Sequence, residues 1–159
     1  MSSISRPDAA PAVSGLDAHL GYWLRAVSNR VSSRFAQRVE GEGVTVAEWV
    51  VLRELYDSRP VKPSALAASL GLTRGAVSKL VDRLRAKGLV RVRDDVADAR
   101  AQRVALTAAG QRLVPVLAAH ADANDAEAFA GLTPSERTQL RAVCERLVAQ
   151  LGGSGAAMD

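Results

Sequence analysis

Aromatic residues, histidine and cysteine are scarce in this sequence. Phe, Trp and Tyr make up 4% of the 159 residues, which together with abundant alanine favours helices over sheets. The single cysteine, Cys144, excludes an internal disulfide and is typical of a protein of the reducing cytoplasm. Its position on an apolar helical stripe predicts a buried, inert thiol. His19 and His120 have no neighbours at ligand spacing, so we expect no metal and no other cofactor.

Long apolar runs are also missing. No run approaches the roughly 18–20 residues that a membrane-spanning helix needs, so no membrane partner is expected. Residues 1–15 lack the apolar core of a secretory signal, and their composition predicts a disordered arm. Residues 153–159 are expected to form a disordered tail. No nucleophile–base pair and no phosphate-cradling glycine loop is recognisable, which argues against an enzyme.

Positive charge is present, but it is confined to one segment. Residues 59–103 contain 11 Lys and Arg against 4 Asp, a net charge of +7, whereas the rest of the chain nets −3. Such a concentration of cations in one part of a chain is typical of a surface that binds nucleic acid.

Helical repeats separated by turn residues occupy the first third of the chain. Apolar residues at steps of three and four predict an amphipathic helix over residues 16–39. Thr45 and Glu48 form the capping box of a second helix, which should end near Tyr56. The residues expected to be buried on that helix are Val46, Trp49, Val50 and either Leu52 or Leu55.

Two shorter helices with a glycine turn between them come next. Ser64 is expected to cap a helix over residues 65–70, and Thr73 a helix over residues 74–87. Gly88 should end the second of these in a left-handed conformation.

A hairpin follows the two short helices. Residues 89–93 and 103–106 alternate apolar and basic side chains, as half-buried strands do, and the polar segment between them should form a loop. With the preceding helices, this predicts a winged helix-turn-helix, whose second helix enters a DNA groove. We therefore expect a mainly α fold with a small β-hairpin wing, and assign residues 45–107 to a DNA-binding domain.

Two long helices are expected after the hairpin. Thr107 should cap a helix that reaches about residue 129 with a kink at Pro115, and a capping box at Thr133 should start a last helix. The terminal helices carry apolar stripes too long for the central unit to cover. We therefore assign residues 16–44 and 108–152 to a helical dimerisation region and expect a two-fold homodimer. The alternative is a monomer whose terminal helices pack on each other.

The helix after Thr73 has two contrasting faces. Its apolar face carries Val77, Leu80, Val81 and Leu84. On the opposite face, small residues let the backbone approach a partner, and Arg74 and Lys79 can donate to guanine or phosphate, unless they are merely solvated charges. The N-termini at Ser64 and Thr73 offer further N–H donors to phosphates. The candidate DNA-binding residues are Ser64, Thr73, Arg74, Gly75, Ser78, Lys79, Arg83 and Arg100.

The hairpin loop supplies one more cation for DNA. Arg100 is the candidate for insertion into a minor groove, where negative potential is concentrated. Aspartates in a loop that faces DNA need a structural reason. Our hypothesis is that Asp98 pairs with Arg83 or Arg100 and so supports the wing.

Taken in order, these segments resemble the MarR (multiple antibiotic resistance regulator) family of transcription factors. The matching pieces are residues 44–55, 66–90, 98–100 and 104–110, and the resemblance extends over about residues 16–151. One departure is the wing, which reads DDVADAR where the family more often has proline and paired arginines.

The resemblance implies a ligand-responsive repressor. In the family, terminal helices of two chains form a dimer base, and the two winged lobes bind a pseudo-palindromic operator. It implies that Arg74, Ser78 and Lys79 enter the major groove and Arg100 the minor groove, and that a small molecule or an oxidant relieves repression. Independently, two reading heads require half-sites about 34–36 Å apart. The alternative is a winged-helix module that binds protein and no DNA.

The resemblance also directs attention to a crevice between the dimer base and the lobe. Aromatic residues with nearby cations would suit a small aromatic or carboxylate effector there. The alternative, which we favour, is that Trp23 and Trp49 fill the apolar core and bind no effector. The candidate effector residues are His19, Tyr22, Trp23, Trp49 and Arg53, with Arg30 nearby in sequence.

Overall fold

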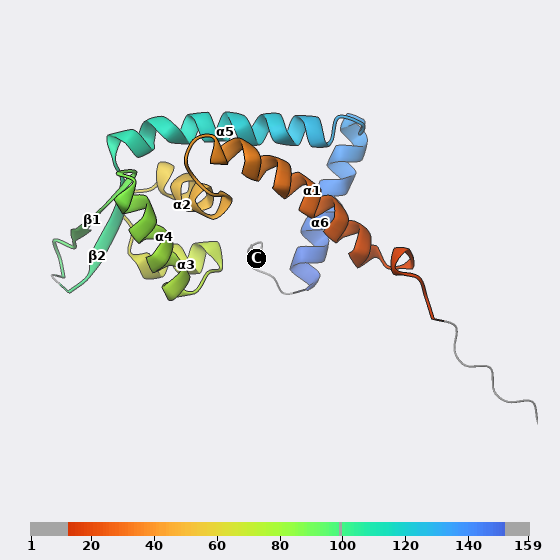
Figure 1. Cartoon of the computed structure of the whole chain (residues 1–159). Coiled ribbons are helices and arrows are strands. Elements are labelled where there is room, and N and C mark those ends of the chain that lie inside the picture. The colour runs from red at the N-terminus through yellow and green to blue at the C-terminus, as the bar shows by residue number, and fades with distance from the viewer. Residues whose placement is uncertain (1–12, 99, 152–159) are drawn as a thin grey trace, which may run out of the picture.

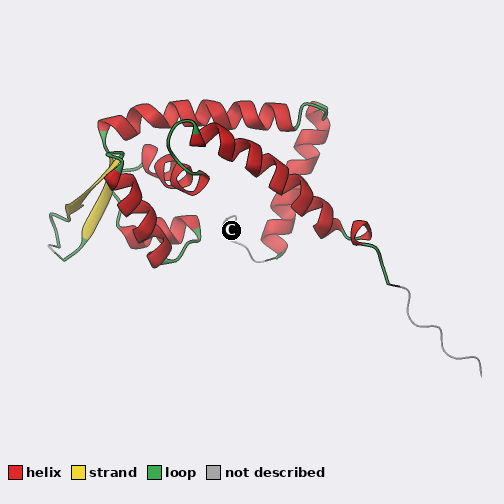
Figure 2. Cartoon of the chain, in the orientation of Figure 1, coloured by secondary structure: helices red, strands yellow, loops and turns green. Residues whose placement is uncertain are grey.

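The computed structural model describes residues 13–98 and 100–151, and the expected disordered arm (but for residues 13–15) and tail lie outside these ranges. Helices dominate and the sheet is a two-stranded hairpin, which confirms the expected fold class (Figure 2). A lobe made of α2, α3, α4 and the hairpin lies at one end, and α1 and α5 run from it to the other (Figure 1). The elements are a 3-10 helix η1 (Leu16–Ala18), α1 (Leu20–Glu40), α2 (Val46–Tyr56), α3 (Pro63–Leu70), α4 (Arg74–Ala86), β1 (Val90–Asp94), β2 (Gln102–Leu106), α5 (Ala108–Ala128) and α6 (Pro134–Gln150).

Local capping chemistry fixes most helix starts where the sequence predicts them. The capping boxes of α2 at Thr45 and of α6 at Thr133 are both complete, and the side chains of Thr73 and Thr107 cap α4 and α5. The expected cap at Ser64 is wrong. Lys62 is the N-cap of α3 and Pro63 is its first residue, because proline has a fixed φ that suits the first helical position.

The N-terminal helix is shorter than predicted. The expected helix over residues 16–39 is divided into η1 and α1 by His19, which has an extended backbone at φ −102° and ψ 126°. The indole Nε1 of Trp23 donates to the carbonyl oxygen of Asp17 at 2.8 Å and so closes the break. Periodicity alone did not reveal this interruption.

The lobe has a closed apolar core. Side chains from every element of the lobe meet in it, and α5 covers it from one side. The deepest residues of α2 are Val51, Leu52 and Leu55, whereas Val46, Trp49 and Val50 are half-buried, so the predicted inner face of α2 was rotated. The largest fully buried apolar side chains are Leu52, Leu66, Leu84, Leu117, Val39, Val51, Val77, Val104 and Val114.

The hairpin is anchored to the lobe through a third short segment. β1 and β2 pair antiparallel with Val92 opposite Val104, and Val61 forms an additional bridge to Val104. Thr107 then joins α5 to the end of α4, because its hydroxyl donates to the Gly88 carbonyl at 2.6 Å. α5 continues through Pro115 without interruption, and Figure 1 shows no sharp bend along it, so the predicted kink is absent.

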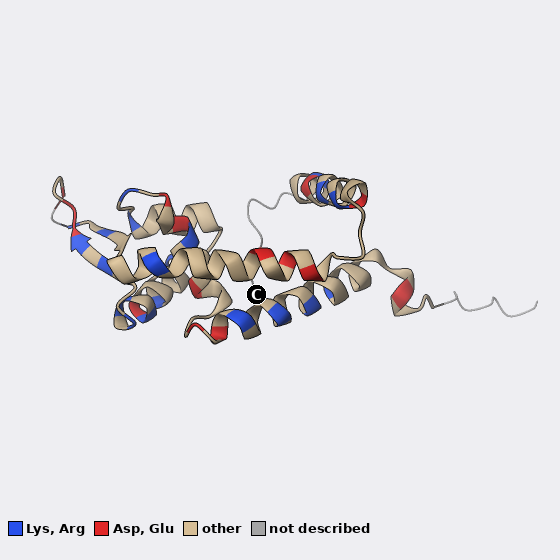
Figure 3. Cartoon of the chain, turned by 90° about the horizontal axis from the view of Figure 1, so that it is seen from above, with Lys and Arg blue, Asp and Glu red and all other residues tan. Residues whose placement is uncertain are grey.

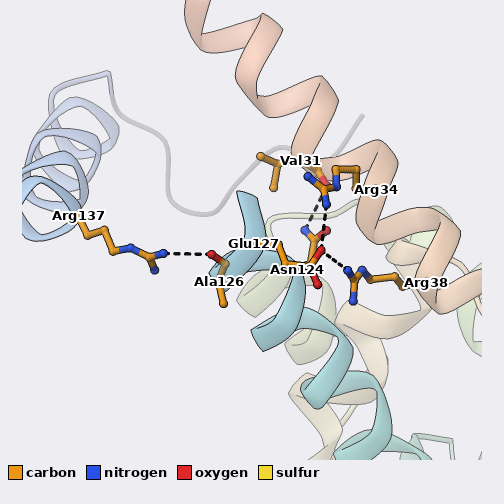
Figure 4. A network of polar contacts seen from close by, with 7 residues as sticks. All are labelled: Val31, Arg34, Arg38, Asn124, Ala126, Glu127 and Arg137. Atoms are coloured by element: carbon orange, nitrogen blue, oxygen red, sulfur yellow. Dashed lines mark hydrogen bonds and ion pairs between the residues drawn. The ribbon is translucent and has the colours of Figure 1, made fainter. Parts of the chain in front are cut away.

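Polar contacts hold α1 against α5 beyond the lobe (Figure 4). The carboxylate of Glu127 accepts hydrogen bonds from Arg34 at 2.9 Å and from Arg38 at 2.6 Å. Asn124 is buried beside them and donates to the carbonyl oxygen of Val31 at 3.2 Å. These contacts join the second half of α1 to the end of α5.

The far ends of α1 and α6 have no apolar cover within the described chain. On α1, Leu20 is 81% exposed and Trp23 is 53% exposed. α6 is joined to α5 at its start and stands clear of α1 (Figure 3), with Val148 50% exposed. Cys144 is also exposed, so the prediction of a buried thiol is wrong for this chain. The stripes exist as the sequence predicts, but the chain does not cover them by itself.

Candidate nucleic-acid interface

The second helix of the helix-turn-helix, α4, packs against the lobe through its apolar face. Gly71, at φ 65°, turns the chain between α3 and α4, and the hydroxyl of Thr73 accepts the N–H of Ala76 at 3.2 Å. The predicted inner residues Val77, Leu80, Val81 and Leu84 are all buried. The opposite side of α4 therefore faces outward.

That outward side carries the predicted DNA-binding residues of this helix. Arg74, Gly75, Ser78 and Lys79 are exposed, as is Arg83 one turn further on. An added Cβ at Gly75 would meet no atom within 4 Å, so the backbone there is open to close approach. Thr73 and Ser64 are exposed too, although Ser64 lies at the second position of α3 and its hydroxyl does not cap that helix.

The basic residues of the lobe fall into two groups. Figure 3 shows cations gathered on the lobe and along α1, with acids in the second half of α5. Arg85, Lys87 and Arg103 are engaged in ion pairs with Asp82, Glu48 and Asp95. Within residues 13–98 and 100–151, the remaining basic residues of the segment have no carboxylate within ion-pair distance; they are Arg59, Lys62, Arg74, Lys79, Arg83, Arg91, Arg93 and Arg100. Unpaired exposed cations are free to meet phosphate or a base edge.

Two aspartates contact the wing, and the predicted one, Asp98, does so through a backbone hydrogen bond where an ion pair was expected. The carboxylate of Asp98 accepts the backbone N–H of Arg100 at 3.0 Å, and the described residues show no ion pair between Asp98 and Arg83 or Arg100. Asp95 is buried and pairs with Arg103 at 3.0 Å. Arg103 also donates to the carbonyl oxygen of Pro60 at 2.9 Å. The sequence DDVADAR gives no signal for which of Asp95 and Asp98 turns inward.

Hydrogen bonds keep the Asp95 carboxylate ionised. The N–H of Ala97 lowers its pKa most, and the Arg103 guanidinium lowers it further against the opposing effect of burial. Asp95 and Arg103 therefore form an ion pair at neutral pH where the loop meets the strands, while Arg100 remains exposed in the loop.

The candidate effector residues do not come together within one chain. Tyr22 and Trp23 touch edge to face, with ring centroids 5.3 Å apart, near His19 at the exposed end of α1. Trp49 packs instead against Phe35, and their ring centroids are 6.3 Å apart. At a rise of 1.5 Å per residue, Phe35 lies about 18 Å along α1 from Trp23.

Each tryptophan therefore has a different environment. Trp49 is half-buried against the core of the lobe, which agrees with a core anchor, but the exposed Trp23 is not one in this chain. Arg53 forms an ion pair with Asp57 at 2.7 Å. Arg30 lines a hollow on α1 that contains none of the five candidates.

Groups suited to metal binding are missing from the part of the chain that the structure describes. His120 contacts Glu42 at 3.0 Å instead of a second histidine. The same part of the chain has no helix with the length and apolar character to span a membrane.

Comparisons with known proteins agree with this geometry. A model described as the MarR family matches residues 42–101. The HTH-type transcriptional repressor Mb2911 of Mycobacterium bovis is 29% identical over 131 residues, which cover 82% of this chain and 94% of that protein. The transcriptional activatory protein BadR of Rhodopseudomonas palustris is 31% identical over 120 residues, covering 72% and 67% of the two chains.

A solved structure shares the whole architecture. BpsR of Bordetella bronchiseptica, whose DNA binding is regulated by 6-hydroxynicotinic acid, superposes with a TM-score of 0.77 at 26% identity. The match covers 86% of this chain and 97% of that one, so it includes the terminal helices as well as the lobe.

Proposed function

This chain belongs to the MarR family and is a DNA-binding transcriptional regulator, and on that premise we propose that it is a ligand-responsive repressor that binds a pseudo-palindromic operator as a homodimer. The observation that carries the proposal is the outward face of α4, where exposed cations without ion-pair partners stand opposite a fully packed apolar face. A helix held in this way can enter a major groove without disturbing the core.

Each candidate residue has a role that its position supports. Arg74 and Lys79 donate to guanine O6 and N7 or to phosphate, and Ser78 hydrogen-bonds to either group beside them. Gly75 lets the backbone of α4 approach the bases. Arg100 enters the minor groove beside the wing. Thr73, Ser64 and Arg83 contact phosphates through the free N–H groups of the first helical turns and a guanidinium.

The homodimer is supported by the exposed apolar residues of the terminal helices. Leu20, Trp23, Leu140 and Val148 are each at least 40% exposed in the single chain, and a second copy would cover them. A two-fold dimer would present its two α4 helices to half-sites about 34–36 Å apart on one side of the duplex.

The proposals of repression and of control by an effector are supported by what the names of related proteins say. Mb2911 is named a repressor, BadR an activatory protein, and BpsR responds to a hydroxylated aromatic acid. We propose repression, relieved by a small aromatic or carboxylate ligand in a pocket that the second protomer completes. His19, Tyr22, Trp23, Trp49 and Arg53 remain its candidate residues. The proposed site of action is the cytoplasm.

The test is binding to a DNA fragment from the promoter of the protein's own gene, against random DNA of equal length. Arg74→Ala should weaken promoter binding by about 1–3 kcal/mol and relax sequence preference. Arg112→Ala removes an exposed cation from α5, outside the predicted interface, and serves as the matched control. Equal losses on both DNAs would remove Arg74 from base reading, and a wild-type protein without any preference for the promoter would overturn the proposed function.

A further inference from the structure

A buried carboxylate lies behind the recognition face of the lobe. Glu48 is 1% exposed, although acidic side chains are seldom fully buried unless they are paired. Its Oε2 accepts the N–H of Thr45 at 2.8 Å, which completes the capping box of α2. The same oxygen accepts a hydrogen bond from Nζ of Lys87 at 2.7 Å.

Lys87 reaches Glu48 from the far end of the recognition helix. It is the C-cap of α4 and precedes Gly88, which has a positive φ of 71°. Its ammonium group also donates to the carbonyl oxygen of Gly43 at 2.9 Å, in the loop between α1 and α2. One side chain thus ties the end of α4 both to the start of α2 and to the loop that leads back to α1.

The charge state of Glu48 favours this arrangement. Burial by itself raises the pKa of Glu48, but the hydrogen bonds from Lys87 and Thr45, together with the charges of Lys87 and Arg83, outweigh it and lower the pKa overall. Glu48 is therefore an anion at neutral pH, and the contact is a charge-assisted hydrogen bond, which is shorter and stronger than one between neutral groups.

Apolar packing alone would define the orientation of α4 less tightly. The buried face of α4 consists of Val and Leu side chains, whose contacts are non-directional. Arg85, on the same helix end as Lys87, pairs at 3.5 Å with the exposed Asp82 of its own helix and so fixes α4 to nothing else. In the described residues, the Lys87–Glu48 contact is the ion pair that joins α4 to another element.

We propose that Glu48 and Lys87 are a positioning pair for sequence recognition, which sets the angle at which α4 presents Arg74 and Lys79 to the bases. The inference rests on the proposed function, in which α4 reads the major groove. Hydrogen bonds to base edges depend steeply on distance and angle, whereas attraction to phosphates acts over a longer range. Release of the pair should therefore reduce binding to specific DNA more than binding to random DNA.

The experiment compares affinities for the promoter fragment and for random DNA at several salt concentrations. Lys87→Met keeps the aliphatic stem and removes the ammonium group. The promoter preference should fall about tenfold, the size of the loss of one good base contact, while the salt dependence on random DNA stays at the wild-type value. Lys87→Arg should restore part of the preference, because a guanidinium can still donate to Glu48.

A second variant covers the case in which Lys87→Met fails to fold with its unpaired buried carboxylate. Glu48→Gln combined with Lys87→Met removes both charges, and should lose no more promoter preference than Lys87→Met alone, since the two residues act as one unit. Arg85→Met is the matched control. It removes a cation from the same helix end and should lower the affinities for promoter and random DNA by the same factor.

Two outcomes would overturn the inference while the proposed function survives. One is a shallower salt dependence for Lys87→Met with equal losses on both DNAs, which would make Lys87 a phosphate contact. The other is an unchanged promoter preference in the double variant. Arg74→Ala in the same series separates the two proposals: if it abolishes a preference that the double variant keeps, only the positioning role has failed.

Discussion

The lobe and the terminal helices are built on the same helical repeat, but they use it differently. In the lobe, the apolar faces of α2, α3 and α4 meet one another and contribute most of the buried core. On α1 and α6, equally regular stripes end with Leu20 81% and Leu151 81% exposed. The comparison teaches that periodicity specifies a helix and its apolar side, while the location of the covering partner depends on what lies nearby in three dimensions.

The two regions also use charge differently. Cations on the lobe are divided between structural ion pairs and an unpaired outward set, whereas Arg34 and Arg38 on α1 both contact Glu127 of α5. The same residue type thus stands unpaired on the proposed recognition surface in one region and contributes to helix packing in the other. The following expectations test whether this division is real.

The largest effect should come from a core residue of the lobe. Leu84 is fully buried, so Leu84→Ala should lower the free energy of unfolding by about 2–5 kcal/mol, measured by urea denaturation. Leu140→Ala on α6, where the side chain is 40% exposed in one chain, should cost less than about 1 kcal/mol at concentrations that keep the protein monomeric. Equal losses in the free energy of unfolding would show that a single chain covers the apolar face of α6 as fully as it covers the core of the lobe.

The next effect concerns association. Leu140→Glu with Val148→Glu places two carboxylates in the apolar stripe of α6 and should weaken the proposed dimer at least about 100-fold, roughly 2.7 kcal/mol, by sedimentation equilibrium. The helical content of the lobe should be unchanged in circular dichroism. Gln139→Glu with Gln150→Glu adds the same charge at polar, exposed positions and should leave the dimer intact. A double stripe variant that still dimerises would show that the α6 stripe is not the dimer contact, and a wild-type protein that sediments as a monomer would favour self-packed terminal helices.

A pH series distinguishes the buried carboxylate of the lobe from the exposed one beyond it. The pKa of Glu48 is lowered from an ordinary value of 4.5, so its ionised form adds stability above that pH, and this contribution disappears as the pH falls through the folded-state pKa. Glu48→Gln should cost about 1.5–3 kcal/mol at neutral pH, and the gap to wild type should close in acid.

Glu127→Gln provides the comparison for that series. The pKa of Glu127 is also lowered, chiefly by the hydrogen bond from Arg38, but its side chain is 50% exposed. We expect Glu127→Gln to lower the free energy of unfolding, measured in urea, by less than Glu48→Gln does. The difference from wild type should again close as the pH falls. A larger effect at Glu127 than at Glu48 would reverse the ranking of the two regions.

Two glycines should give effects of opposite sign, and the smaller of the two is expected at Gly75. An added Cβ at Gly110 would collide with the carbonyl oxygen of Leu89, so Gly110→Ala should cost about 1–3 kcal/mol in thermal or urea unfolding. Gly75 has open space, and Gly75→Ala should stabilise α4 by up to about 1 kcal/mol. Weaker promoter binding by this more stable variant would place the α4 backbone against DNA, and unchanged binding would remove Gly75 from the interface.

Much of the fold could be predicted because its signals are local. Thr45, Thr73, Thr107 and Thr133 cap helices by contacts with N–H groups three residues away, and Gly88 leaves α4 in the expected conformation. The outward face of α4 followed from the positions of its apolar residues. The candidate DNA contacts were predictable for that reason and remain predictions in their detail.

The errors share a different cause. The ion pair of the wing was assigned to Asp98 but is made by Asp95, because it depends on Arg103 across the hairpin, which Pro60 before α3 also contacts. Trp23 was expected to be buried as a large aromatic residue and Cys144 as part of an apolar stripe, but the neighbouring elements of the described chain leave both exposed. Gly110 carried no local signal, since the atom that requires a glycine there belongs to Leu89.

The sequence by itself determined where helices start and stop, which side of each is apolar and where positive charge gathers, because hydrogen bonds and spacing within about four residues decide these features. Only the tertiary structure decided that Lys87 meets Glu48, 39 residues away, and that α6 leaves its stripe open. Such pairings depend on the relative placement of whole elements, and their energy comes from burial and from charge contacts that exist only after the elements have packed.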